Sequence, residues 1–547
     1  MNMGKERREW MDDCLAGGRW VGLLAAGALA AGLALPARGQ LLGQSLFPPD
    51  NPWNQNVGAA PVATNSEAVM ALIGLTTPFH PDWGDDDPGN GESPLYGIPY
   101  NVVHGSRVAA VTVVVDDYAD ESDLEPVPIP ANAVVEGDYQ DGPNPNGAGY
   151  NQGQRGDSHL IVWDADSNAG YELYGATRPD DPYLFDGVTP HTDGLWHAAQ
   201  ESVWYFQTNY FRPLGYTSAD AAGLPILAGL ARPDEGLPAS AGGLGAIRHA
   251  LRMTLPGGIV SGQYLYPASH VVAASGVLPF GARLRLRNSE AVNNVVAGMG
   301  PQAQILARAM QQYGLILADI GSAMYVTGTS ASESDGNQTV LVWNMDDVLG
   351  LRALTAGDFD VVDLTPVVVG VSPAAGPAGG MVTITGQNFS GAAGQITVYF
   401  GPNPDAQPQV LGDSQISAAV PPGSGSVEVR VRSGRDEPDT YDGPWANMNE
   451  PIFGYGVSAS STGDSFVYTN GPVIERVQVT GGSLVASGVY SGGAGVTYDV
   501  LASTDVSLPL SQWETLASGT FDSGGNFSFT DSVPGIATAR FYVVKAP

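Results

Sequence analysis

The chain has 547 residues, 43% of them hydrophobic, which is enough for several hydrophobic cores and therefore for several domains. Its formal net charge of -33 argues against nucleic acid and anionic membranes as general partners, because both repel an acidic surface. The one cysteine, Cys14, precedes the first apolar run, so the chain beyond it has no disulfide framework.

The N-terminal segment has the pattern of an export signal. Basic residues precede an apolar run at 21–35, and small residues follow it up to Gly39. We therefore predict a signal peptide at residues 1–39 and a secreted, extracellular protein. An uncleaved membrane anchor is the alternative. No later stretch is long and apolar enough to cross a bilayer, so we expect no integral membrane segment in the mature chain.

Residues 40–365 form the first predicted domain, which contains every histidine and most of the tryptophans. Short strand-like runs alternate here with glycine, proline and aspartate, and this pattern predicts a β-rich, sandwich-like domain with a few helices. Helical spacing is found at 218–230 and 301–313, with Gly314 placed to end the second helix. The expected strands are 111–115, 160–163, 171–174, 251–254, 284–286, 341–343 and a buried strand within 314–322.

Residues 159–174 predict a hairpin with one chemically rich face. If the turn is 165–170, Trp163 pairs with Glu172, and the alternation of side chains puts His159, Ile161, Trp163, Glu172 and Tyr174 on one side. Leu160, Val162 and Leu173 then share the other side. A face of this composition suits the floor of an open cleft, where aromatic rings stack on sugars and a carboxylate transfers protons.

Most enzymes that cleave a glycosidic bond use a pair of carboxyl groups as their catalytic groups. Glu172 is the first candidate for a general acid, because aromatic neighbours would raise its pKa by desolvation. Asp157 is the expected partner, with Asp220 as the next choice, while Trp163 and Tyr174 would bind the sugar. The alternative is that Glu172 pairs with an arginine and Asp157 caps a turn.

Histidines and arginines predict two other chemistries. His159, His249 and His270 lack the short spacing of known metal motifs, so a metal site would have to be assembled from distant segments. The run 281–287 places Arg283 and Arg285 on one strand face, where they would bind the carboxylates of an acidic polysaccharide or pair with aspartates. If they bind uronates, His159 or His249 would act as the base of a lyase.

Acidic loops such as 164–170 alternate oxygen-bearing side chains as calcium loops do, although no glutamate stands at the twelfth position of an EF-hand. We expect no required cofactor, and structural calcium is the one ion that the composition suggests. The chain has no nucleophile-elbow or phosphate-loop motif.

Residues 366–446 change to valine and small residues. The runs Val367–Pro373, Gly376–Phe389, Val398–Gly401 and Ile416–Pro421 resemble the IPT/TIG immunoglobulin-like family. This resemblance implies a small β-sandwich that acts as a spacer or binding module and carries no catalytic motif. After a linker at 447–471, short alternating strands at 473–479, 496–501, 525–530 and 539–544 predict a second sandwich module at 472–547.

Together these features predict a mainly β, secreted enzyme that degrades a polysaccharide by acid/base cleavage. The first alternative is a non-catalytic extracellular protein that binds glycans or proteins. The second is a histidine-ligated metal-dependent hydrolase or an arginine-assisted lyase. The expected partner is a polysaccharide or cell-surface glycan, and the sequence carries no signal for the oligomeric state.

Overall fold

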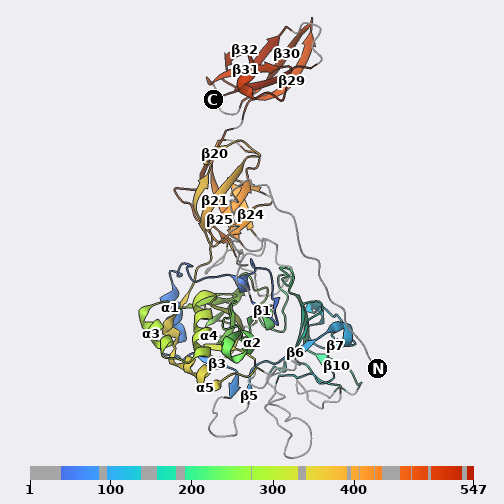
Figure 1. Cartoon of the computed structure of the whole chain (residues 1–547), viewed down its shortest axis with the longest axis vertical. Helices are drawn as coiled ribbons and strands as arrows, with labels where there is room; N and C mark the ends of the chain where they lie inside the picture. The colour runs from blue at the N-terminus through green and yellow to red at the C-terminus, as the bar shows by residue number, and fades with distance from the viewer. Residues whose placement is uncertain are drawn as a thin grey trace, which may run out of the picture. The chain divides into compact units, whose positions relative to one another are not determined.

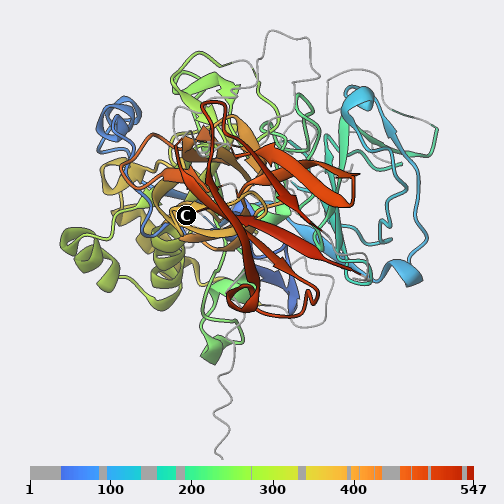
Figure 2. The same ribbon diagram turned by 90° about the horizontal axis from the view of Figure 1, so that it is seen from above.

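The structure is a computed structural model. It describes residues 39–85, 95–136, 157–179, 191, 193–272, 274–329, 341–390, 396–405, 407–423, 425–433, 456–469, 471–490, 495–532 and 539–546. The predicted signal peptide therefore lies outside the described residues, apart from Gly39. The described part of the chain is β-rich with few helices, as the sequence predicts, and Figures 1 and 2 show its ribbon from two directions.

A four-stranded sheet contains the predicted hairpin. Its order is β11 (Gln200–Tyr205), β9 (Ala169–Tyr174), β8 (Leu160–Asp164) and β6 (Tyr100–Val103), and only β6 and β8 run parallel. Ile161 lies opposite Glu172, and Trp163 lies opposite Gly170. The pairing is thus shifted by two residues from the predicted register, which leaves the assignment of side chains to the two faces correct because side chains alternate with a period of two.

Both faces of this sheet are buried. Ile161 and Trp163 belong to the largest core cluster of the domain, while Leu160, Val162 and Leu173 pack in a second cluster with Val103, Val113, Val127 and Ala198. The chemically rich face of the sheet is therefore covered by the core of the domain along most of the length of the strands. It does not form the floor of an open cleft.

A mixed six-stranded sheet forms the second scaffold of the domain. Its order is β18 (Phe359–Val361), β15 (Arg283–Leu286), β16 (Leu315–Ile320), β12 (Leu251–Leu255), β17 (Tyr325–Thr327) and β3 (His80–Asp82). The central strands β12 and β16 are parallel and mostly buried, which fits the apolar run Leu315–Ala318 of β16.

Helix α4 (Pro301–Gln312) packs against β15, and α3 (Glu290–Ala297) packs against α4. Helix α4 starts with proline at its first position, and the Asp347 carboxylate accepts hydrogen bonds from the backbone N–H groups of Gln302 and Ala303. Gly314 follows its C-terminus with φ of 73°. This helix and its glycine stop confirm the sequence prediction.

Two local predictions for this domain are wrong. Residues 218–230 form loops with one short 3-10 turn at Leu227–Gly229, because their apolar side chains are buried from several directions instead of along one helical stripe. Residues 341–343 form no strand, and Trp343 packs on Trp83 with ring centroids 5.7 Å apart.

The other described elements of this domain are short. The helices are α1 (Ser66–Ile73), α2 (Pro233–Gly236) and α5 (Met345–Val348), and the strands are β1 (Gln40–Leu41), β2 (Gln44–Ser45), β4 (Gly84–Asp85), β5 (Leu95–Tyr96), β7 (Val113–Val115), β10 (Trp196–Ala198), β13 (Val260–Tyr264) and β14 (Leu278–Phe280). Strands β7 and β10 pair in parallel, and Val113 and Ala198 join them to the core on one face of the four-stranded sheet.

The second module is a β-sandwich. One sheet has the order β19 (Val367–Ser372), β21 (Met381–Gln387), β25 (Gln415–Ala419) and β24 (Gln409–Gly412). The other comprises β20 (Ala375–Gly376), β28 (Ser465–Tyr468), β26 (Ser426–Ser433), β22 (Ile396–Phe400) and β23 (Asn403–Asp405), with β27 (Gly456–Val457) beside β26. Phe466 and Tyr468 of β28 lie in its core, so the linker expected at 447–471 is wrong at its C-terminal end.

The C-terminal module, red in Figures 1 and 2, consists of two three-stranded sheets. These are β29 (Val473–Thr480), β30 (Ser483–Val489) and β33 (Asn526–Asp531), and β32 (Glu514–Thr520), β31 (Thr497–Ser503) and β34 (Phe541–Lys545). Tyr498, Val500, Phe527 and Phe529 form its core. The four predicted strands agree with β29, β31, β33 and β34 within three residues at each end, whereas β30 and β32 were not predicted. No helix among the described residues is long and apolar enough to cross a membrane.

Candidate functional site

A cavity of about 300 Å³ lies where residues from both sheets of the first domain meet. Asp157 stands before β8, Tyr174 ends β9, Gln200 begins β11 and Asp319 lies near the C-terminal end of β16. The loop 217–221 and the segment around His270 complete its wall. The lining residues are Tyr118, Asp157, Tyr174, Gln200, Thr217, Ser218, Ala219, Asp220, Ala221, His270, Val272, Asp319 and Ile320.

An ion-pair network forms part of this wall. The Arg252 guanidinium donates to both carboxylate oxygens of Asp220, at 2.6 and 2.9 Å, and to Asp319 Oδ2 at 3.1 Å. A third donor, Nη1, binds Thr327 Oγ1 at 2.6 Å. Asp220 is buried and held in a bidentate pair, which is the strong geometry for an arginine and a carboxylate.

Two carboxylates share this one guanidinium, so their charges are not balanced. Desolvation and the charge of Asp220 raise the pKa of Asp319 far above its ordinary value, although Arg252 opposes the shift. Burial alone would lower the pKa of Arg252, but the charges of Asp220 and Asp319 raise it. We conclude that Asp319 is the group of this network that holds a proton near neutral pH.

The exposed side of the cavity is formed by Asp157 and Tyr174. Asp157 is exposed, and Tyr174 is partly buried. Burial and the charge of Asp157 raise the pKa of the Tyr174 hydroxyl, which therefore stays protonated. His270 donates through Nδ1 to the carbonyl of Ala221, 2.8 Å away. The cavity thus offers a solvent-accessible carboxylate, a phenol hydroxyl and an imidazole to a ligand.

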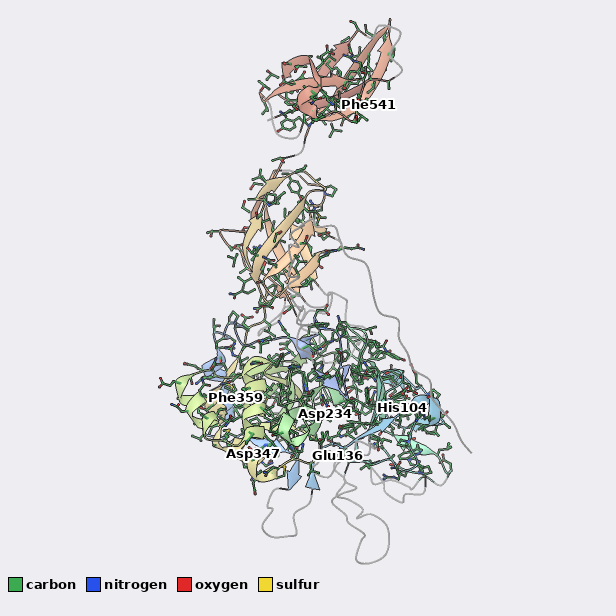
Figure 3. The ribbon with its side chains drawn as sticks, viewed as in Figure 1. His104, Glu136, Asp234, Asp347, Phe359 and Phe541 are labelled. Atoms are coloured by element: carbon green, nitrogen blue, oxygen red, sulfur yellow. The ribbon has the colours of Figure 1, made fainter. Side chains whose placement is uncertain are left out.

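His159 lies beneath this wall and is only 2% exposed. Its Nδ1 lies 2.6 Å from Oε2 of Glu136, a residue labelled in Figure 3, and its Nε2 lies 3.0 Å from the carbonyl oxygen of Ala219. Burial would lower the pKa of His159, but the charge and hydrogen bond of Glu136 raise it to about 9. Both nitrogens therefore donate, and His159 positions Ala219 at the cavity instead of acting as a base.

This pair predicts a pH dependence of stability. A histidine with a pKa of about 9 in the folded state and 6.5 when unfolded stabilises the fold fully below pH 6.5, and this stabilisation is lost as the pH rises through 9. The loss is about 3 kcal/mol at 1.36 kcal/mol per pKa unit. Urea unfolding at pH 6 and pH 10 should show it in the wild type and in His104→Ala, whose histidine is exposed. His159→Gln should flatten the profile, and an equally steep profile in His159→Gln would contradict the assignment.

Glu172 is fully buried and does not line the cavity. Its Oε1 accepts from the backbone N–H of Leu227 at 2.8 Å, and its Oε2 accepts from Ile226 N–H at 2.9 Å and from Trp204 Nε1 at 3.1 Å. Burial raises the pKa of Glu172 to about 7, while the two backbone donors oppose the shift. The predicted rise in the pKa of Glu172 is present. The predicted contact with substrate is not, because the carboxylate binds the backbone of the loop 226–227 and holds that loop against the sheet.

We expect Glu172→Gln to lower the free energy of unfolding by about 2–4 kcal/mol, because an amide NH₂ would face one of three N–H donors and leave it unsatisfied. Chemical denaturation followed by tryptophan fluorescence measures this. Exposed Glu67→Gln serves as the control and should change stability by less than about 0.5 kcal/mol. If Glu172→Gln has the same free energy of unfolding as the wild type, the three hydrogen bonds contribute little to stability.

Trp163 and His249 also have structural positions that contradict their predicted roles. Trp163 is completely buried, and its Nε1 donates to Asn168 Oδ1 at 3.0 Å, so it cannot stack on a sugar. His249 is 1% exposed and lies between Glu235 Oε1, at 2.6 Å from Nε2, and the Ala250 carbonyl, at 2.7 Å from Nδ1. It does not line the cavity.

The arginines of β15 bind the protein itself. Arg283 is buried and donates to the carbonyls of Tyr313 and Pro52, and Arg285 donates to the carbonyls of Val57, Gly58 and Ala60. Arg287 of the same run pairs with Asp360 at 2.8 Å. These contacts fasten the N-terminal segment to the six-stranded sheet, and they contradict the expected capture of uronates.

The acidic loop 164–170 uses its oxygens within the protein. Asp164 accepts from the backbone of Gly105 and Asp166 and from Ser167 Oγ, and Asp166 pairs with His104, labelled in Figure 3, at 2.7 Å. Hydrogen bonds from Ser106 and His104 hold the pKa of Asp166 well below its usual range. Structural calcium stays a prediction.

The three histidines that were expected to share a metal do not come together. Within the described ranges, the one group of histidine, cysteine or acidic residues whose ligand atoms all lie within 4.8 Å is Asp116, His191 and His197. The structure thus contradicts metal ligation by His159, His249 and His270 jointly. It places Asp157, Tyr174, Asp220 and His270 at one cavity, together with Asp319, Tyr118 and Gln200.

Comparison with known proteins identifies one module. Residues 366–442 match the IPT/TIG domain family, which confirms the resemblance seen in the sequence. No curated protein matches the chain.

Several solved structures are similar to parts of the chain. An auxiliary nutrient binding protein from Bacteroides ovatus is 18% identical over 25% of this chain and 26% of that one, with a TM-score of 0.15. The Bacteroides ovatus mixed-linkage glucan utilization locus protein SGBP-B, solved with a heptasaccharide, is 13% identical over 32% and 39%, with a TM-score of 0.13. The Yersinia pseudotuberculosis adhesin InvE is 12% identical over 30% and 50%, with a TM-score of 0.13. The chain spans half or less of each, and similarity at this level leaves the function to be argued from the cavity.

Proposed function

We propose that the first domain binds a sugar unit of a neutral extracellular polysaccharide in the cavity beside Asp157, Tyr174 and Asp319. The observation that carries the proposal is the convergence of these polar groups, from strands and loops far apart in the sequence, at one cavity of about 300 Å³. That volume is at the lower end for small-molecule sites and suits one sugar unit or a short oligosaccharide.

The chemistry of the lining supports a hydroxyl-bearing, uncharged ligand. Carboxylates accept hydrogen bonds from sugar hydroxyls, and Tyr174, His270 and Gln200 supply further donors and acceptors. Arg252 is engaged by Asp220 and Asp319, and neither lysine nor arginine is among the residues that line this cavity. An anionic sugar would therefore meet several carboxylates without a cation, which disfavours uronic acids and the lyase alternative.

The C-terminal modules fit an extracellular role. IPT/TIG sandwiches and the C-terminal sandwich carry no predicted chemistry, so we propose that they space the first domain from a surface or hold it near an insoluble glycan. The acidic net charge and the predicted export signal agree with a location outside the cell.

Glycosidic cleavage is the second candidate, and one specific observation favours it. The same cavity holds Asp319, whose raised pKa keeps a proton available for a leaving oxygen, and the exposed Asp157, which would serve as base or nucleophile. In this candidate mechanism Asp157 and Asp319 form the acid/base pair in place of Glu172, because Glu172 is buried in the core.

One experiment separates the two candidates. The full chain and its Asp319→Asn variant are titrated calorimetrically with neutral and uronic oligosaccharides, and reducing ends are measured in parallel. Binding of neutral sugars without new reducing ends supports the binding function. New reducing ends that are lost in Asp319→Asn support cleavage. If the chain shows no binding and forms no product across a broad panel of oligosaccharides, the proposal is overturned.

A further inference from the structure

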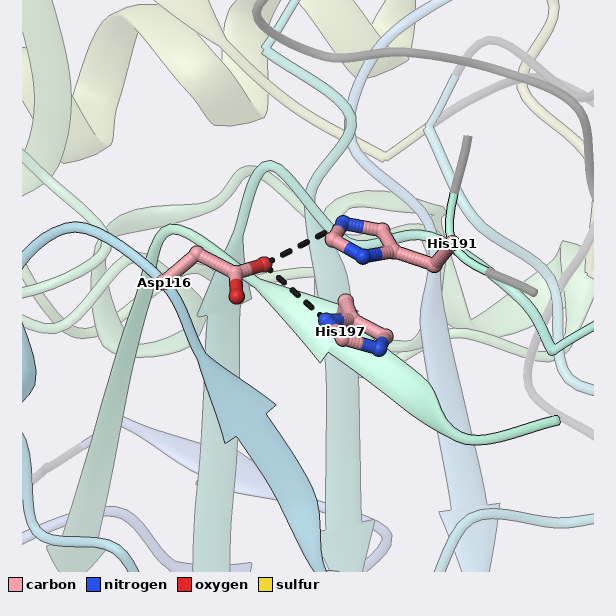
Figure 4. A group of neighbouring side chains, drawn as sticks. All are labelled: Asp116, His191 and His197. Carbon is pink, nitrogen blue, oxygen red and sulfur yellow. Dashed lines mark hydrogen bonds and ion pairs between the residues drawn. The ribbon is translucent and has the colours of Figure 1, made fainter. Parts of the chain in front are cut away.

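Asp116, His191 and His197 form a cluster that lies outside the sugar cavity and its wall. Strand β7 runs parallel to β10 with Val114 opposite His197, and the backbone N–H of Asp116 continues the pairing by donating to the Ala198 carbonyl at 2.9 Å. Asp116 and His197 are thus fixed on adjacent extended segments. His191 reaches the same point from the chain preceding β10, and Figure 4 shows both rings turned toward the Asp116 carboxylate.

The distances within the cluster suit metal coordination. Asp116 Oδ2 lies 3.0 Å from His197 Nδ1 and 3.3 Å from His191 Nε2. Metal–ligand bonds of 2.0–2.2 Å in a tetrahedral site require ligand atoms to be about 3.4 Å apart. The three potential ligand atoms lie within 4.8 Å of one another. The two imidazole rings are stacked, with centroids 3.4 Å apart and 11° between their planes, so one ring has to rotate for both lone pairs to point at the same ion.

A carboxylate outside the cluster orients one of the histidines. His197 Nε2 lies 3.2 Å from both oxygens of Asp193, on the opposite side of the ring from Asp116. A metal-ligating histidine commonly donates its other ring N–H to a carboxylate, which fixes the tautomer and aims the lone pair at the metal. With Nε2–H directed at Asp193, the Nδ1 lone pair points to Asp116 and to the position that a metal would take.

We propose that Asp116, His191 and His197 bind a divalent transition metal, with Zn²⁺ as the best-suited ion. Two imidazoles and one carboxylate are a ligand set of intermediate softness, which suits Zn²⁺ and disfavours Ca²⁺, because Ca²⁺ takes six to eight oxygen ligands. Asp116 and His191 have side chains 39% and 35% exposed, so an ion can reach the site from solvent. Three protein ligands leave the fourth tetrahedral position to water.

The ion would hold the chain before β10 against the end of β7. Tyr118, two residues beyond Asp116, lines the sugar cavity and pairs with Ala199 through its backbone N–H at 2.9 Å. None of the three ligands lines the cavity itself. An ion at this site would therefore cross-link the two segments, and its binding does not depend on the sugar-binding proposal.

Zinc binding is tested on the untagged full chain after treatment with a chelator. Isothermal titration with ZnCl₂ should give one site per chain, and Co²⁺ should give the intense visible absorption of a four-coordinate site. His191→Ala should lose both signals, and Asp193→Asn should weaken zinc binding about 10–100-fold. His191 is half-buried, so far-ultraviolet circular dichroism is used to verify that its replacement leaves the fold intact.

His104→Ala is the matched control, because His104 also pairs with one aspartate, Asp166, at 2.7 Å but has no second histidine beside it among the described residues. It should bind zinc as the wild type does. The proposal is overturned if the wild type binds no zinc, if His191→Ala binds it equally well, or if Ca²⁺ displaces zinc at equal concentration.

Discussion

Replacing Arg252 by methionine is expected to lower the free energy of unfolding of the first domain by about 3–5 kcal/mol, because it leaves a buried negative charge without its cationic partner. Asp220 is 1% exposed and receives two of the arginine's hydrogen bonds, and Asp319 receives another. Methionine replaces the aliphatic part of the arginine side chain but carries no charge. Urea unfolding monitored by tryptophan fluorescence measures the effect.

Arg287→Met is the control for removing an arginine, since its pair with Asp360 is 35% exposed on the arginine side and should contribute less than about 1 kcal/mol. The double variant Arg252→Met, Asp220→Leu should recover part of the lost free energy of unfolding, because it removes the unpaired Asp220 charge together with the arginine. If Arg252→Met is no less stable than Arg287→Met, the network does not hold the cavity wall.

The second large effect is on ligand binding. Asp157→Asn is expected to weaken the binding of a neutral oligosaccharide about 10–100-fold, which corresponds to the loss of a charge-assisted hydrogen bond. Asp157 is exposed at the cavity, so its substitution should leave stability nearly unchanged. Calorimetric titration of the wild type and the variant with the same sugar gives the ratio.

Asp117→Asn controls for the general effect of removing a nearby negative charge. Asp117 is exposed and close enough for its charge to act on Tyr174, but it does not line the cavity. Its variant should bind the sugar within about twofold of the wild type. Equal losses in Asp117→Asn and Asp157→Asn would mean that the charge acts at a distance and that no ligand contacts Asp157.

Local patterns predicted much of the fold. The alternation in 159–174 assigned every side chain of the hairpin to its correct face, even though the turn is two residues shorter than expected, because a shift by two preserves the faces. The helix at 301–312, the IPT/TIG module and the C-terminal strands are predictable from equally local signals. What alternation does not reveal is whether a face is covered, and here the largest core cluster of the domain covers the chemically rich face.

The site was predicted only in part, because it is assembled over long sequence separations. Asp157, Tyr174, Asp220 and His270 were candidates and line the cavity, whereas Glu172, His159 and Trp163 are buried and do not line it. Arg252 was missed. Its signal is an arginine between Leu251 and Met253 in an apolar strand, since a charge in such a position requires a buried partner.

The grouping of Asp116 with His191 and His197 was missed for a different reason. Asp116 and His197 are 81 positions apart in the chain, and the parallel pairing of β7 with β10 that brings them together leaves no periodic trace in either segment. His197 has no local signal beyond the tryptophan that precedes it. Short-range spacing therefore detects helical and loop metal motifs, but not ligands gathered by neighbouring strands.

The most direct test of the central claim, that a sugar binds in this cavity, is calorimetric titration of Ala221→Trp with the tightest-binding oligosaccharide of the wild type. Ala221 lines the cavity, so the indole should fill the space without changing any charge. Exposed Ala239→Trp is the matched control. We expect Ala221→Trp, folded by circular dichroism, to lose measurable binding while Ala239→Trp keeps it. Undiminished binding by Ala221→Trp would place the sugar site elsewhere.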